Sequence, residues 1–190
     1  EDESGTFILS SKDLCMIQHI PELVHAGIAA WKIEGRMKSP YYVAAVTRIY
    51  REALDRYFAD PHGYAYDPRW LLELEKVSHR EYGTGFFSGN QGYNSQTTHP
   101  GTIYIKEYDY LGMINNVLSN DVAEVLVKNK ILGNTSIEIM GRRLSEDFTQ
   151  VLLDLRNEYN ESIKTAHVGQ KVRIKMSRPV HKYFMLRKCG

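Results

Sequence analysis

The first 40 residues repeat one order of features: a short apolar stretch, a charged loop, and a helix start with a capping residue. Residues 7–9 are predicted as a strand, with Ser11 capping a helix that reaches residue 26. Residues 28–33 are predicted as the second strand, and Ser39 caps a helix that opens with Pro40, whose missing N–H costs nothing there. Two successive βα units predict a parallel sheet with crossover helices.

Charged residues follow both predicted strands. In α/β barrels the loops after the strands open on one common face and carry the catalytic groups. We therefore expect Lys12, Glu34 and Arg36 to act as catalytic groups that converge there with Cys15, while Lys32 and Lys38 bind substrate. Arginine binds carboxylates and phosphates with two parallel hydrogen bonds and lysine supplies a point charge, so the set favours an anionic substrate.

Two alternatives apply to Glu34. It can form an ion pair with Arg36 or Lys12 that only fixes the loop. A role as general base requires burial, whereas cationic neighbours favour its charged form.

The rest of the N-terminal half is predicted to be helical and then loop-like. Residues 40–60 have apolar positions at helical spacing, with Arg48 among the charged residues assigned to the opposite face, and Asp67 caps a second helix. Phe86 lies in a glycine-rich loop and is a candidate for stacking on a base, the alternative being a core position. Residues 90–99 are the expected linker. Because a parallel sheet needs neighbouring strands, residues 1–97 are expected to be the last βα units of an incomplete TIM-like barrel.

After Pro100 the pattern changes from helical to alternating. Short alternating segments separated by turn residues predict a small antiparallel β-barrel over residues 98–190. These segments are residues 101–105, 111–114, 122–127, 135–140, 148–153 and 171–176.

The charge balance also changes along the chain. Residues 1–97 carry 10 Lys and Arg against 13 Asp and Glu, whereas residues 98–190 carry 14 against 10. A basic region near the end favours a polyanion such as RNA, with Arg173 and Lys175 as the main contacts; the alternative is an ordinary solvated barrel face. The full basic set is Lys171, Arg173, Lys175, Arg178, Lys182, Arg187 and Lys188.

Composition narrows the class of protein. The chain has 190 residues, 43% of them hydrophobic, a net charge of +1, and no apolar run long enough to span a bilayer. We expect a cytoplasmic protein. Cys15 and Cys189 are the only cysteines, so each is expected to be a thiol or a metal ligand rather than part of a disulfide framework. No serine or cysteine nucleophile has a matched base.

Several motifs resemble those of peptidase family U32, the collagenase-like proteins. They are Ser-Lys-Asp-Leu-Cys at residues 11–15, Lys-Ile-Glu-Gly-Arg-Met-Lys-Ser at 32–39, and the helix that follows. Residues 101–102, 123–125, 137–141 and 169–174 resemble the C-terminal β-barrel of that family, which is similar to the second domain of elongation factor Tu.

The resemblance implies three hypotheses. Members with this barrel resemble proteins of tRNA wobble-uridine 5-hydroxylation, which use prephenate, so the full-length protein would be a tRNA-modifying enzyme. The runner-up is a metal-assisted peptidase acting on collagen-like chains. The third is a non-catalytic module that binds RNA or another partner.

The resemblance also implies a cofactor. Several members hold a [4Fe-4S] cluster on four cysteines, and Cys15 matches a ligand position; the alternative is a buried thiol. This fragment alone cannot supply four thiolates, and it is expected to be inactive by itself.

Overall fold

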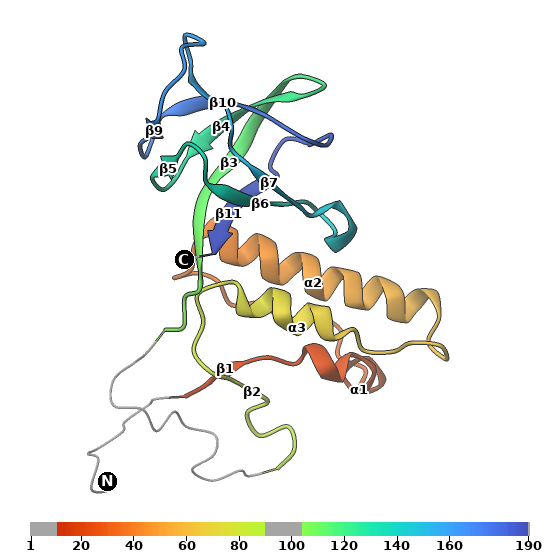
Figure 1. Ribbon diagram of the computed structural model, residues 1–190. Helices are drawn as coiled ribbons and strands as arrows, with labels where there is room; N and C mark the ends of the chain where they lie inside the picture. The colour runs from red at the N-terminus through yellow and green to blue at the C-terminus, as the bar shows by residue number, and fades with distance from the viewer. Residues whose placement is uncertain (1–10, 90–103, 190) are drawn as a thin grey trace, which may run out of the picture. The chain divides into compact units, whose positions relative to one another are not determined.

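The computed structural model describes residues 11–89 and 104–189, and the chain divides into two units, Glu1–Glu107 and Tyr108–Gly190 (Figure 1). The predicted strand at 7–9, the linker at 90–99 and most of the segment at 101–105 lie outside the described residues. So does the predicted boundary at residues 97 and 98. The two units are described separately.

The N-terminal unit contains two very short strands and three α-helices. β1 pairs with β2 in parallel, Asp13 opposite Tyr82 and Leu14 opposite Gly83. α2 and α3 lie side by side (Figure 1). The elements are β1 (Asp13–Leu14), a 3-10 turn at Ile17–His19, α1 (Ile20–His25), α2 (Pro40–Ala59), α3 (Pro68–Glu75) and β2 (Tyr82–Gly83).

The start of α2 confirms the capping prediction. The Ser39 hydroxyl accepts a hydrogen bond from the Tyr42 N–H at 3.2 Å, and Pro40 occupies the first helical position. Asp67 caps α3 in the same way, through the N–H of Arg69 at 3.0 Å. These local signals act within one turn of helix, so they do not depend on the rest of the fold.

Packing between α2 and α3 buries one stripe of α2. Its buried apolar residues recur every four positions and pack with two large side chains of α3, Trp70 and Leu74. Arg48, predicted on the solvated face, is instead 8% exposed and forms a buried ion pair with Glu73 of α3. The stripe consists of Tyr41, Ala45, Ile49, Ala53 and Tyr57.

Two predicted elements of this unit are wrong. Ser11 caps no helix, because the chain continues as β1 and the helix begins only at Ile20, with Pro21 in the first turn where proline is tolerated. Residues 28–33 form no strand, and Ile28 is 47% exposed. An extended apolar segment becomes a strand only when a partner backbone satisfies its N–H and C=O groups, and the described residues give this segment no ladder.

The C-terminal unit is a curled antiparallel sheet. Seven strands follow the order β7-β6-β11-β3-β4-β10-β8, and β5 pairs with β9 separately. Its elements are β3 (Tyr108–Ser119), β4 (Val122–Val127), β5 (Ile131–Leu132), β6 (Ser136–Met140), a 3-10 turn at Leu144–Glu146, β7 (Phe148–Val151), β8 (Leu155–Asn157), β9 (Thr165–Ala166), β10 (Lys171–Lys175) and β11 (Met185–Cys189).

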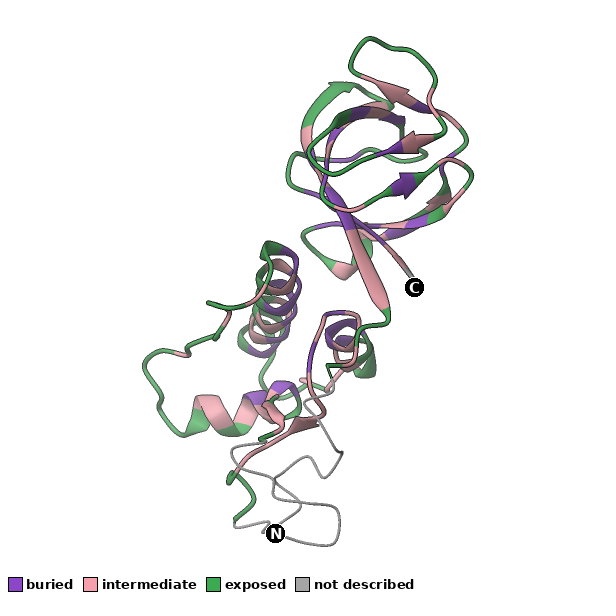
Figure 2. Cartoon of the chain, turned by 90° about the vertical axis from the view of Figure 1, so that its left-hand side faces the viewer, coloured by how far each residue is buried: buried purple, intermediate pink, exposed green. Residues whose placement is uncertain are grey.

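Topology explains why the sheet curls. β7 and β8 are its two edges, yet only residues 152–154 connect them. Six strand spacings of a flat sheet would hold the edges roughly 29 Å apart, whereas so short a connection spans only about 14 Å. The sheet therefore bends round an apolar interior (Figure 2), which contains Ile114, Val125, Ile139, Val172 and Leu186 among others.

One residue of β11 contradicts the prediction that the basic residues near the C-terminus all lie on one surface. Arg187 lies on this strand, is fully buried, and is paired with Glu138 of β6 at 2.5 Å. It therefore belongs to the interior of the unit. In the described parts of the chain, no helix is both long enough and apolar enough to cross a membrane.

Candidate functional site

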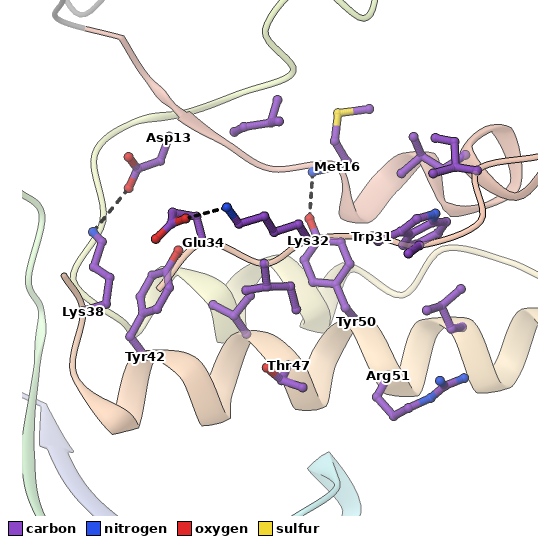
Figure 3. Close-up of a pocket in the computed structure, with 17 residues that line it drawn as sticks. Asp13, Met16, Trp31, Lys32, Glu34, Lys38, Tyr42, Thr47, Tyr50 and Arg51 are labelled. Carbon is purple, nitrogen blue, oxygen red and sulfur yellow. Dashed lines mark hydrogen bonds and ion pairs between the residues drawn. The ribbon is translucent and has the colours of Figure 1, made fainter. Parts of the chain in front are cut away.

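A pocket of about 570 Å³ lies in the N-terminal unit, over one face of α2 (Figure 3). Its walls are the β1 segment, the irregular residues 28–34 and α2, and most of the lining is apolar. The lining residues are Asp13, Leu14, Met16, Leu23, Ile28, Ala30, Trp31, Lys32, Ile33, Glu34, Lys38, Tyr42, Val46, Thr47, Tyr50, Arg51 and Leu54.

Lys38 and Asp13 form the polar end of the pocket. The Lys38 Nζ lies 3.6 Å from an Asp13 carboxylate oxygen and donates a hydrogen bond to the Ser78 carbonyl at 3.1 Å. The same ammonium lies 5.0 Å from the ring centroid of Tyr42 and 4.5 Å from that of Tyr104, within the range of cation–π attraction. Several contacts therefore fix the position of this cation.

Glu34 is charged and belongs to a loop-internal network. Its carboxylate accepts the Arg36 N–H at 3.0 Å and lies 3.4 Å from the Lys32 Nζ. The Arg36 N–H and then Lys32 lower the pKa of Glu34 below its usual value. A carboxylate stabilised in its charged form is a poor general base near neutral pH. The ion pair of Glu34 is therefore with Lys32, and not with Arg36 or Lys12 as the sequence suggested.

Tyr50 connects the pocket to Cys15. Its hydroxyl accepts the Met16 N–H at 2.8 Å and lies 3.9 Å from the Cys15 Sγ. Burial raises the pKa of both the thiol and the phenol. Burial therefore favours the protonated form of the half-buried Cys15 thiol, and a metal would have to displace that proton.

The structure separates several residues that the sequence predicts to converge. Glu34 lines the pocket, whereas Lys12, Cys15 and Arg36 are not among its lining residues. Lys12 instead pairs with Glu81 at 3.2 Å. Their catalytic and metal-binding roles stay predictions.

The remaining predicted contacts lie elsewhere. Phe86 is 74% exposed and outside the pocket lining. Arg173 and Lys175 lie on β10 of the C-terminal unit, where Lys175 is 3.6 Å from Asp121 and Arg173 faces Glu124 of β4 in the strand register. Acidic neighbours therefore offset part of the basic charge of this strand.

Sequence reasoning assigned one apolar stripe of α2 to packing and not to the pocket. Four residues spaced four apart line the pocket, and each directly follows a member of the buried stripe in sequence. They are Tyr42, Val46, Tyr50 and Leu54. Their common spacing was a usable signal. Asp13 was also missed, although it lies in the charged run at residues 11–15.

Comparisons with known proteins place the chain among curated relatives. It is 34% identical over 98% of its length to the tRNA hydroxylation protein P1 of Bacillus subtilis, covering 44% of that protein. It is 35% identical over 87% of its length to the tRNA hydroxylation protein P of Escherichia coli, covering 36% of it. The chain thus spans less than half the length of these relatives.

Other relatives have different names. The chain is 34% identical over 47% of its length to a protein named collagenase from Porphyromonas gingivalis, covering 25% of it. A crystal structure of the C-terminal domain of a U32 peptidase from Geobacillus thermoleovorans matches 43% of this chain and 92% of its own, with 28% identity and a TM-score of 0.40.

Two family models cover most of the sequence. Peptidase family U32 matches residues 1–97, and the peptidase family U32 C-terminal domain matches residues 106–187. The chain belongs to peptidase family U32.

Proposed function

We propose that this chain is part of an enzyme that hydroxylates tRNA at position 5 of the wobble uridine, with prephenate as co-substrate. The observation that carries the proposal is its similarity, over 98% of its length, to a protein named for tRNA hydroxylation. The enzyme would act in the cytoplasm, where tRNA is available.

The pocket supports a small anionic co-substrate. Prephenate carries one carboxylate on its ring and a second at the end of its pyruvyl side chain, and the pocket combines an apolar lining with the cations of Lys32 and Lys38. Lys32 is the more available of the two, since its side chain is 86% exposed and its Glu34 partner is also largely exposed. A ligand carboxylate would replace Glu34 beside Lys32, and Trp31 would contact the ring.

The proposed architecture follows the family. Residues 1–97 would be the last part of an α/β barrel, in which the parallel β1–β2 pair is one contact between neighbouring strands. Residues 98–190 would be a barrel similar to the second domain of elongation factor Tu, and its basic strand β10, with Arg173 and Lys175, would contact RNA.

An iron–sulfur cluster does not fit this chain by itself. A [4Fe-4S] cluster needs four ligands, usually thiolates, and the sequence has only Cys15 and Cys189. We propose Cys15 as one ligand of a cluster whose other ligands lie outside this chain. If so, Cys15→Ser in the full-length protein lowers the visible absorbance of the cluster, and unchanged absorbance rules the ligand out.

A peptidase is the second candidate, favoured by the relative named collagenase. The peptidase implied by the resemblance is metal-assisted, and the two carboxylates that line the pocket, Asp13 and Glu34, are each paired with a lysine, so the argument from the site is weaker. A binding module without catalysis is the third.

The decisive experiment is rescue of tRNA hydroxylation. The full-length protein is expressed in Bacillus subtilis lacking its tRNA hydroxylation proteins, and tRNA nucleosides are quantified by mass spectrometry. We expect the wild type to restore hydroxylated uridine and Lys32→Met to lower it about tenfold or more, since roughly 1.5–3 kcal/mol is lost with a charged hydrogen bond.

Lys128→Met, an exposed lysine at the end of β4, is the matched control and should behave as wild type. Absence of hydroxylated uridine with the wild type, together with cleavage of a collagen peptide, would replace the proposal by the peptidase.

A further inference from the structure

Tyr183 occupies an unusual backbone conformation in the connection between β10 and β11. The N–H of Phe184 donates to the carbonyl of His181 at 3.1 Å, closing a β-turn with Tyr183 at its third position. Its φ is +74°, in the left-handed region. Glycine or asparagine ordinarily occupies this position, because a Cβ is disfavoured there.

The turn is held firmly on both sides. The Tyr183 N–H donates to the carbonyl of Ile114 on β3 at 2.8 Å, and the Ile114 N–H donates to the carbonyl of Phe184 at 2.8 Å. Phe184 and Val180 are buried, at 2% and 7% exposure. The backbone of Tyr183 is therefore fixed by the sheet and by the core contacts of its neighbours.

The side chain of Tyr183 contributes little to the stability of the fold. Its ring is 62% exposed, so burial cannot offset the cost of the left-handed conformation, which is about 1–2 kcal/mol for a residue with a Cβ. Strained backbone positions cluster at ligand and active sites, so this exposed side chain on a fixed backbone is a reason to look for a ligand here.

The chemistry around the ring is cationic. The Lys182 Nζ lies 5.1 Å from the ring centroid, and Arg178, whose guanidinium lies 5.6 Å from the Phe148 ring centroid, is also exposed in this connection. The sequence contains no Asp or Glu after Glu161. This positive charge favours a polyanion as the partner and disfavours a basic protein.

Two acids lie on the neighbouring turn, and backbone N–H groups of that turn hold both of them. Phe184 packs against Gly141, at the start of the turn that holds Glu146 and Asp147. The Glu146 carboxylate accepts the N–H groups of Arg142 and Arg143, and Asp147 accepts that of Gly141 at 2.8 Å. Both carboxylates are thus engaged in fixing their own turn.

We propose that Tyr183 is a stacking platform for one unpaired base of an RNA loop, and that Lys182 binds the adjoining phosphate. Exposed aromatic rings beside cations bind single-stranded bases in this way. The inference rests on the proposed tRNA function and adds a specific contact to it, on a different part of the C-terminal unit from β10.

The test uses a substitution that removes the ring without harming the turn. Tyr183→Gly suits the positive φ, so the thermal midpoint should stay equal or rise. Binding of an unmodified tRNA transcript to the full-length protein, measured by fluorescence anisotropy, should weaken about 5- to 150-fold, the value of one stacked base. Tyr183→Phe should retain binding. Lys182→Met should reduce the salt dependence of tRNA binding by the amount expected for the loss of about one phosphate contact.

Tyr159→Gly is the matched control, because Tyr159 is 77% exposed in another turn of the same unit; it should bind as wild type. Wild-type affinity in Tyr183→Gly would overturn the platform and leave the proposed function intact. An equal loss of affinity for a fully paired RNA duplex would also overturn it, since a duplex offers no free base. Failure of the wild type to bind any tRNA would instead remove the RNA function itself, and the platform with it.

Discussion

At the scale of single residues, Lys38 shows how a charged motif can position a loop. The sequence predicts it as a substrate contact, and it does line the pocket. It also joins three separate segments, because it pairs with Asp13 of β1, donates to Ser78 after α3, and lies over Tyr42 of α2. Lys32, in the same motif, has the exposed Glu34 as its one ion-pair partner among the described residues. The two lysines should therefore respond differently to substitution.

Lys38→Met should destabilise the N-terminal unit by about 1–3 kcal/mol, because it leaves Asp13 and the Ser78 carbonyl without this donor. Lys32→Met should change the free energy of unfolding by less than about 0.5 kcal/mol, since it removes an exposed ion pair. Urea unfolding of the two variants measures the difference. Equal stability of both would show that Lys38 does not hold the loop.

At the scale of elements, local signals were predictable and pairing partners were not. The caps at Ser39 and Asp67 were readable because one side chain and one nearby N–H determine them. Residues 28–33 have the composition of a strand, but strand formation depends on a partner that sequence spacing does not reveal. For the same reason the burial of Arg187 was not predictable, because it depends on Glu138, 49 positions away.

The cap of α3 gives a pH prediction. Hydrogen bonds from Arg69, with further ones from Arg56, hold the pKa of Asp67 well below its usual range. A carboxyl with a lowered folded-state pKa stabilises the fold fully above its unfolded pKa of about 4, and this contribution is lost as the pH falls below that value.

Asp67→Asn should therefore lower the thermal midpoint at pH 7, and its difference from wild type should shrink at pH 3. Asp55→Asn, which removes an exposed pair with Arg51 on α2, is the control. A difference that stays constant between pH 7 and pH 3 would contradict the role assigned to Asp67.

At the scale of the whole molecule, the change of sequence period after Pro100 identified two structural classes, a helical unit and an antiparallel sheet. The candidate site was predictable only in part. Lys32, Glu34 and Lys38 line one pocket as neighbours in sequence. Lys12 does not line the pocket because it pairs with Glu81, and Arg36 does not line it because it lies in the turn after Glu34. The direction of both side chains depends on the folded backbone, which the sequence pattern does not give.

The short connection between β7 and β8 has a consequence for behaviour at high concentration. Terminal strands of open sheets recruit strands from other molecules and so promote aggregation. Here the Gln150 amide of β7 bonds the Lys175 carbonyl and the Ser177 N–H, both at 2.9 Å, and Arg156 of β8 bridges to Ser162. These contacts occupy part of each outermost strand, so a strand of another molecule would have to displace them before it could add to the sheet.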